Sequence, residues 1–253
     1  MCLILFSYEN HPRYKLVIAA NRDEFYARST QPAHFWEKEP HILAGKDSEA
    51  GGTWMGISKK GKLSMLTNFR DPMNIKSNAP SRGHLVSDYL LDGDDAYSYL
   101  KNLEASGATY NGFNLICGSI DKLHYFGNYQ NGVHEISTGV HGLSNALLNT
   151  PWPKVKKGKA DLQAALEAET ISPESLFNLL YDDVYAKESD LPDTGVGLEK
   201  ERMLSPLFIK SSHYGSRSST VILIDKSNRV QFLERTYNIA DFTSSTVSFE
   251  FQV

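Results

Sequence analysis

The feature that most constrains the fold is a series of apolar, β-prone segments that come in pairs joined by short turns. The first pair is "CLILFSY" at 2–8 and "YKLVIAAN" at 14–21, separated by the turn-like "ENHPR". Pairs with such short connections form antiparallel hairpins. Three more hairpins are predicted, at 51–69 with Gly61 in the turn, at 113–129 around Asp121 and at 215–237. The other predicted elements are strands within 132–145, a polar loop at 186–205 and a closing strand at 245–253.

Helix-forming segments come in two consecutive pairs, at 81–91 and 92–106 and again at 153–169 and 172–182. Consecutive helices do not alternate with strands, which argues against a doubly wound parallel sheet. The order instead favours two antiparallel sheets stacked face to face, with one helix pair over each outer side. We therefore expect an α+β fold, a four-layer αββα sandwich, in one domain spanning residues 1–253.

Composition and charge exclude several function classes. The chain of 253 residues is long enough to bury a core, and its net charge of -4 gives no footprint for nucleic acid. No apolar run could span a bilayer, and the N-terminus lacks the features of a secretory signal. Cys2 and Cys117 form neither a disulfide framework nor a metal site, and the basic run at 154–159 predicts a solvated helix start. We expect a cytoplasmic protein without a cofactor.

Cys2 stands directly behind the initiator methionine. Methionine is normally removed only before a small residue, and cysteine qualifies, so trimming would free the Cys2 α-amine. An amine beside a thiol can take the thiol proton and activate the sulfur as a nucleophile without a histidine. The alternative interpretation is a small apolar residue at the start of a buried strand.

A polar tetrapeptide, Asn21-Arg22-Asp23-Glu24, ends the second predicted strand directly after the apolar run "LVIAA". Pairing of the first two strands would bring these side chains near Cys2. There Asp23 could hold the α-amine, and Arg22 could hold Asp23 or a substrate carboxylate. The alternative is a solvated strand end with a local ion pair, which contributes little.

Two asparagines, Asn68 in "LTNF" and Asn145 in "GLSN", follow apolar strands. Their amides are suitable donors for the oxyanion of an acyl-transfer reaction, and turn formation is the alternative explanation for each. Asn149 is a rival to Asn145. Arg217 lies at the entry to another apolar strand, where its guanidinium could orient a carboxylate or pair with Asp23; the alternative is a surface arginine beside a turn.

Several sequence blocks, taken in order, resemble the landmarks of the NRDE family, also called the transport and Golgi organisation 2 family. The signature "NRDE" at 21–24 is accompanied along most of the chain by "MC", "GGTWMGI", "LTNFRDP", "SRGHLV", "GLSNALLNTPWPKV" and "YGSRSSTV". That family is similar to the N-terminal-nucleophile (Ntn) hydrolases of the choloylglycine hydrolase and penicillin acylase branch. The resemblance implies their αββα fold and amide cleavage by an N-terminal cysteine.

The resemblance also implies a role for each matched position. Cys2 matches the nucleophile, and Asp23 matches the aspartate that steadies its amine. Asn68 and Asn145 match asparagines associated with the amine and the oxyanion, and Arg217 matches the late arginine. To these catalytic candidates we add three substrate-binding candidates, Asn21, Arg22 and Trp54, and no metal ligand. Trp54 could line a pocket, and the alternative for it is a core or edge aromatic.

Arg22 departs from the hydrolase pattern. Those enzymes carry R-N-x-D at the end of the second strand, whereas this chain has "A-N-R-D". Asn21 and Asp23 then align, and the arginine falls one place late. Because strand side chains alternate between faces, we expect Arg22 to point away from Cys2.

The residues and the resemblance together predict a Cys-type Ntn hydrolase that cleaves a C–N amide or acyl bond of a small-molecule substrate. The alternative is a non-catalytic protein of the same fold that binds haem or takes part in lipid or acyl-CoA handling, because family members are linked to both. A third hypothesis is a structural Cys2 in a globular protein of unrelated function.

Overall fold

Two antiparallel sheets lie at the centre of the computed structural model, which describes residues 2–91, 93–168 and 171–253. Within these residues, one sheet has six strands in the order β10 (Gly139–Leu143), β1 (Cys2–Tyr8), β2 (Tyr14–Phe25), β11 (Tyr214–Asp225), β12 (Arg229–Tyr237) and β13 (Ser244–Gln252). The other has seven strands in the order β3 (Thr30–Phe35), β4 (Ile42–Asp47), β5 (Met55–Ser58), β6 (Lys62–Asn68), β7 (Phe113–Ser119), β8 (Lys122–Gly127) and β9 (His134–Glu135). The predicted hairpins are confirmed, and β2 pairs with β11 to join the two ends of the chain in one sheet.

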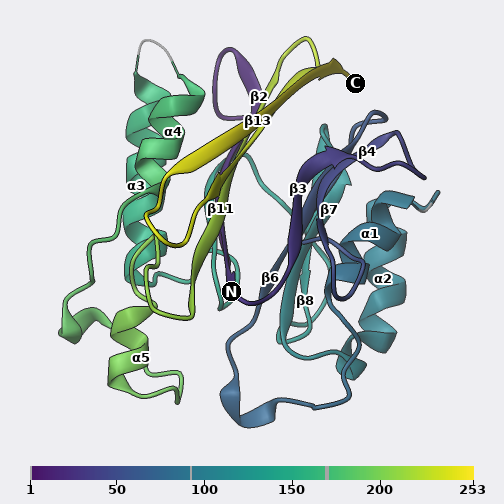
Figure 1. Ribbon diagram of the computed structural model, residues 1–253. Coiled ribbons are helices and arrows are strands. Elements are labelled where there is room, and N and C mark those ends of the chain that lie inside the picture. The colour runs from purple at the N-terminus through teal and green to yellow at the C-terminus, as the bar shows by residue number, and fades with distance from the viewer. Residues whose placement is uncertain (1, 92, 169–170) are drawn as a thin grey trace.

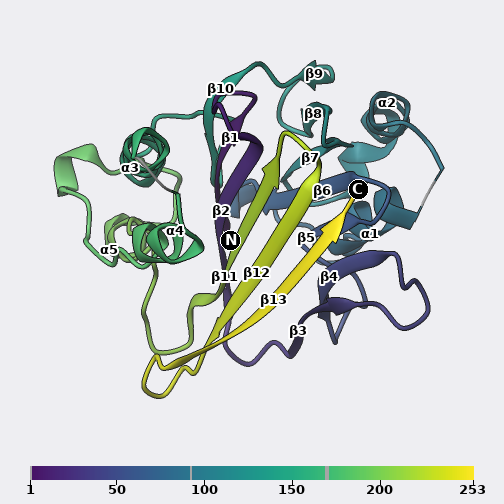
Figure 2. The ribbon, with the colours of Figure 1, turned by 90° about the horizontal axis from the view of Figure 1, so that it is seen from above.

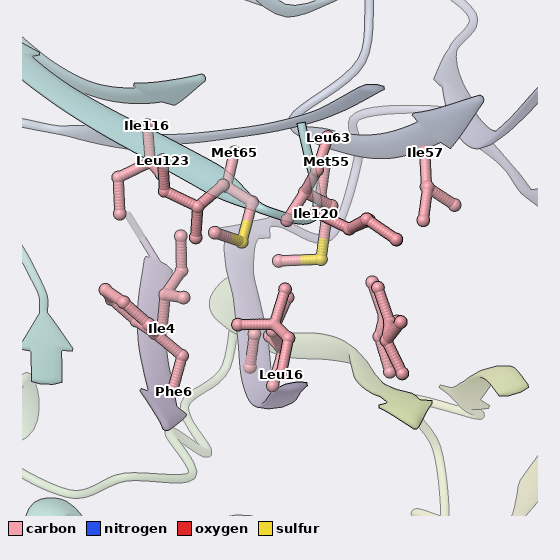
Figure 3. Packing of buried hydrophobic residues seen from close by; sticks show 14 of the residues in the cluster. Ile4, Phe6, Leu16, Met55, Ile57, Leu63, Met65, Ile116, Ile120 and Leu123 are labelled. Atoms are coloured by element: carbon pink, nitrogen blue, oxygen red, sulfur yellow. The ribbon is translucent and has the colours of Figure 1, made fainter. Parts of the chain in front are cut away.

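The main core fills the space between the two sheets (Figure 3). Successive side chains of a strand point to opposite faces, so Ile4 and Phe6 of β1 and Leu16 of β2 face residues such as Met65 of the other sheet. Cys2 shares the alternation of Ile4 and Phe6. Its side chain therefore belongs to the inter-sheet face, which fixes the side from which a substrate could reach the sulfur.

One helix pair covers the outer face of each sheet, which gives four layers (Figure 1 and Figure 2). Helices α1 (Gly83–Leu91) and α2 (Ala96–Ser106) pack on the seven-stranded sheet. Helices α3 (Pro153–Glu167) and α4 (Pro173–Leu180) pack on the six-stranded sheet. The αββα sandwich is confirmed; residues 92 and 169, which belong to predicted helices, lie outside the described residues. No helix in the described ranges has the length and apolar composition needed to cross a membrane.

The structure differs from the sequence prediction in two segments. No strand is predicted where β3 and β4 form, because β3 contains Pro32 and a register shift between Gln31 and His34 that remove the usual strand pattern. The predicted polar loop at 186–205 contains a short helix, α5 (Leu198–Met203), and its buried residue is Glu201. A six-residue helix whose one buried side chain is charged gives no amphipathic signal.

Candidate functional site

A cavity of about 370 Å³, here called the cleft, opens between the sheets where β1 begins and β2 and β6 end. Its volume falls in the ordinary range of small-molecule sites, roughly 300–1,000 Å³. The predicted site residues that line it are Cys2, Arg22, Asp23, Trp54, Asn68 and Arg217. Among the described residues, Asn21 and Asn145 do not belong to its lining.

Cys2 is the first residue of β1, and it is only 7% exposed. Burial raises the pKa of the Cys2 thiol, while the charge of Arg22 and a hydrogen bond from the backbone N–H of Asp23 act in the opposite direction. The sulfur is thus shielded from bulk water and borders the cleft. Met1, whose removal would free the Cys2 α-amine, lies outside the described residues.

Arg22 projects from the same face of the sheet as Cys2, so the prediction that it points away is wrong. The β1–β2 register sets Cys2 opposite Arg22, and residues directly opposite in an antiparallel pair share a face. The arginine is displaced from the position of Ala20 by two places and not by one, and a shift of two places keeps a side chain on its face. Arg22 Nη2 lies 4.0 Å from Glu24 and 3.9 Å from Asp47, whereas the buried Nη1 has no hydrogen-bond partner among the described residues.

Asn21 projects from the opposite face of β2, toward the helix layer, and is fully buried. Its Nδ2 donates to the carbonyl oxygens of Leu180 at 2.9 Å and Leu207 at 2.8 Å. Its Oδ1 accepts a hydrogen bond from Ser219 Oγ at 2.6 Å. The structure therefore does not bring Asn21 to the cleft; the side chain fastens β2 to α4 and to the chain before β11.

Asp23 alternates with Arg22 and is 1% exposed. Its Oδ1 accepts a hydrogen bond from Ser216 Oγ at 2.6 Å, and that hydroxyl in turn accepts from the N–H of Ile209 at 2.9 Å. Burial raises the pKa of the Asp23 carboxyl, and the charge of Lys154 opposes this change. These contacts fix the carboxyl at the end of the sheet where β1 begins.

The asparagines occupy different positions relative to the cleft. Asn68, the last residue of β6, lines it. Asn145 is fully buried, and its Nδ2 donates to the carbonyl oxygen of Asn68 at 2.9 Å, so it supports the cleft wall from behind. Asn149 accepts from the N–H of Gly142 at 3.0 Å and contacts His141, and it is not among the lining residues.

Arg217 and Trp54 both border the cleft. Arg217 Nη1 donates to the carbonyl oxygens of Phe25 at 3.2 Å and Tyr26 at 2.8 Å, and also to that of Arg28. This guanidinium therefore holds the turn that follows β2. Trp54 is partly buried against the inter-sheet core and leaves part of its surface to the cleft.

Sequence reasoning missed Glu234 and Arg82, which also line the cleft. Glu234 is 5% exposed, its Oε1 accepts from the N–H of Ala33 at 2.7 Å, and burial raises its pKa. The alternation in β12 gives a signal for it, because Val230 and Phe232 face the core and Glu234 continues the same face. For Arg82 we find no such signal beyond its place in the block "SRGHLV".

Sequence reasoning also missed Lys154, which does not line the cleft but lies on the helix side of the six-stranded sheet. It is 3% exposed, so the expectation of a solvated helix start is wrong at this position. The signal is helical spacing: Lys154, Gly158, Leu162 and Leu166 recur every four residues, and all are buried. Nearby, Arg70 and Glu201 form a buried ion pair at 2.6 Å.

The described residues contain no group of three or more histidine, cysteine or acidic side chains arranged to hold a metal ion. The chemistry that the cleft itself offers is that of a thiol surrounded by cationic and amide donors, with carboxyl groups beside it. This set suits acyl transfer or the binding of a polar ligand.

Two solved structures share this fold. The C2A mutant of the conjugated bile acid hydrolase from Clostridium perfringens matches with a TM-score of 0.55 at 8% identity, covering 100% of this chain and 97% of that one. The Caenorhabditis elegans N-acylethanolamine-hydrolyzing acid amidase ortholog matches with a TM-score of 0.50 at 11% identity, covering 88% and 92%. At such identities the likeness shows the fold alone, and that fold is the Ntn-hydrolase sandwich.

The sequence identifies the family. Residues 1–239 match the family described as Transport and Golgi organisation 2, and the chain belongs to it. A mouse Transport and Golgi organization 2 homolog is 39% identical over 258 residues, covering 93% of this chain and 92% of the relative. The human homolog is 37% identical over 273 residues, covering 99% of both chains. The resemblance given by the sequence blocks is confirmed.

Proposed function

We propose that this protein is an N-terminal-cysteine hydrolase that cleaves the C–N amide bond, or a related acyl bond, of a polar small molecule. The observation that carries the proposal is the position of Cys2: it begins a strand at the wall of a cavity of about 370 Å³. The bile acid hydrolase with the same fold is a C2A mutant, so that protein also has a cysteine at position 2 of its own sequence.

The reaction begins when removal of Met1 frees the Cys2 α-amine. The amine accepts the thiol proton, and the sulfur attacks the carbonyl carbon of the substrate to form a tetrahedral oxyanion. When the C–N bond breaks, the leaving nitrogen takes the proton from the ammonium group, and a thioester to Cys2 remains. Water then attacks the thioester; its acyl carbon gains the hydroxyl, and the proton returns to the sulfur.

The surrounding residues take roles that follow from their contacts. Asp23, fixed by Ser216, holds the amine. Asn68 stabilises the oxyanion, and Asn145 positions Asn68 through the bond to its carbonyl oxygen. Arg217 keeps the turn after β2 in place beside the nucleophile.

The substrate class follows from the cleft lining. Cationic side chains (Arg22, Arg28, Lys46, Arg82 and Arg217) and acidic ones (Asp23, Glu24, Asp47 and Glu234) surround the space. Removing charged groups from water is costly unless they meet polar partners, so a purely hydrocarbon ligand would be a poor match for these walls. A compact amide that carries polar or charged groups fits them better, with Arg22 and Trp54 in contact with it.

A binding function is the second candidate, and the arginines of the cleft favour it. Haem and acyl-CoA are both anionic, and Arg22 and Arg82 border the same space as Cys2. Among the described lining residues, Cys2 alone belongs to the residue types that ligate haem iron. Haem binding in the cleft would therefore weaken in a Cys2→Ala variant and change its Soret band.

The intact mass of the protein produced in cytosol tests the proposal at its first step. A mass lower by one methionine is the expected result, and it would be followed by a screen of N-acyl substrates. A protein that keeps Met1 has no free amine at Cys2, and this outcome would overturn the hydrolase in favour of ligand binding.

A further inference from the structure

Lys154 is a buried cation for which the hydrolase mechanism has no stated use. It lies in the first turn of α3, and its neighbour Val155 packs in the core between α3 and the six-stranded sheet. It is 3% exposed, whereas Lys156 and Lys157 of the same helix are exposed. The Lys154 side chain therefore points into the protein, toward the face of strands β1 and β2 that α3 covers.

The burial of this amine is energetically unfavourable on local grounds. Lys154 Nζ has no hydrogen-bond partner among the described residues. A charged group taken out of water without hydrogen bonds is destabilising, and the N-terminal end of a helix disfavours a positive charge further. A position of this kind is retained only if a nearby negative charge compensates for it.

Asp23 supplies that compensation. The charged and titratable groups that act on Lys154 come from every neighbouring element: Asp23 on β2, Cys2 on β1, Arg70 after β6 and Glu201 on α5. Asp23 is the strongest of these, and Lys154 is in turn the strongest electrostatic influence on Asp23. Glu201 is already engaged by Arg70 at 2.6 Å, which leaves Asp23 as the main counter-charge of Lys154.

We propose that Lys154 is a positioning residue whose charge, acting from behind the sheet, keeps Asp23 ionised and favours the reactive thiolate of Cys2. The physical basis is general: a positive charge stabilises the deprotonated form of every titratable group near it. Asp23 alone would do the reverse, because its negative charge disfavours a thiolate beside it. Lys154 offsets that effect, so Asp23 can orient the amine without suppressing the nucleophile. This inference extends the proposed hydrolase site.

Lys154 is itself titratable, so its effect on the reactivity of Cys2 should depend on pH. Burial lowers the pKa of Lys154 to about 8. Below that pH Lys154 is charged and assists Cys2; above it Lys154 is neutral and the assistance disappears. The groups that face Cys2 besides Asp23 and Lys154 are Arg22, Arg82 and Tyr214.

The experiment measures the rate of iodoacetamide alkylation of Cys2 against pH, read from the mass of the N-terminal peptide. We expect Lys154→Met to be alkylated about fivefold more slowly than the native protein at pH 7, which corresponds to a rise of roughly 0.7 in the pKa of the thiol. Above pH 9 the two proteins should react at similar rates, because Lys154 is then neutral. Lys154→Arg should keep the fast rate across the whole range.

The controls separate electrostatic positioning from packing. Lys156→Met removes an exposed charge from the same helix and should leave the profile unchanged. Equal rates for Lys154→Met and the native protein at pH 7, or a deficit that is the same at every pH, would overturn the proposal. If Lys154→Met does not fold, Lys154→Gln replaces it. The readout is independent of turnover, so a protein that hydrolyses no amide still gives a decisive result.

Discussion

The two faces of strand β2 carry alternate residues of one tetrapeptide and use them differently. On the helix face, Asn21 has its amide fully engaged with Leu180, Leu207 and Ser219. On the cleft face, Arg22 has only long ion-pair contacts, and its Nη1 lacks a hydrogen-bond partner among the described residues. One short motif therefore fastens the sheet to its helices and also supplies a side chain that lines the cleft. Mutations on the helix face should lower stability, and mutations on the cleft face should lower function.

The largest effect is expected at Cys2, on the cleft face. Cys2→Ala should lower turnover of an N-acyl substrate by at least about 10³-fold, because the nucleophile is lost. The free energy of unfolding should change little, since alanine fills most of the same space at the start of β1. Steady-state kinetics and urea unfolding check the two statements, and full activity in this variant would end the covalent mechanism.

Asn21→Ala should have the next largest effect, and it should concern stability. The change removes the donor of two buried carbonyl oxygens and leaves the Ser219 hydroxyl with Tyr237 as its remaining partner, which should lower the free energy of unfolding by about 3 kcal/mol. Arg22→Gln is the matched change on the cleft face. Because Arg22 has ion-pair contacts of only 3.9–4.0 Å and Asp47 keeps its bond from Arg28 at 2.6 Å, this change should alter stability less than Asn21→Ala does while weakening substrate binding. Urea unfolding of both variants measures the contrast. A loss of substrate binding in Asn21→Ala without a loss of stability would instead indicate that Asn21 contacts the substrate.

The smallest effect is a pH dependence of stability that comes from Glu234. Burial raises its pKa above the ordinary value of 4.5, so the folded protein holds this proton more tightly than the unfolded chain. That stabilisation is fully present below pH 4.5 and is lost as the pH rises through the folded-state value. Glu234→Gln can keep the bond from the Ala33 N–H, so it should be more stable than the native protein at pH 7, and this advantage should disappear by pH 4. Thermal unfolding of the native protein and of Glu234→Gln at pH 7 and pH 4 measures this advantage. The same difference in stability at both pH values would contradict the role given to Glu234.

The fold was predictable because hairpins and helix pairs are encoded locally. The turn at Gly61, with φ of 77°, needs a residue that tolerates the left-handed region, and its flanking segments alternate as strands do. β3 could not be predicted in the same way, because Pro32 and the register shift obscure its pattern. Local chemistry thus specified most elements and their antiparallel pairing.

The candidate site was predictable only in part, because it depends on contacts between distant segments. The face of β2 from which Arg22 projects follows from its cross-strand partner Cys2. Counting positions from the R-N-x-D pattern of the hydrolases predicted the opposite face. The engagement of Asn145 with Asn68 and the burial of Lys154 arise when the second sheet and α3 pack against β1 and β2. Sequence spacing alone does not contain that packing.

The covalent intermediate on Cys2 tests the central claim most directly. The native protein should be mixed with an activated N-acyl or ester substrate, quenched with acid within the first turnovers, and its N-terminal peptide weighed. The account predicts a peptide that begins at Cys2 and carries the acyl group, as a thioester while the sample stays in acid and as an amide on the Cys2 α-amine once it is neutralised. Substrate turnover without an acyl group on that peptide, or with the same turnover in Cys2→Ala, would contradict it.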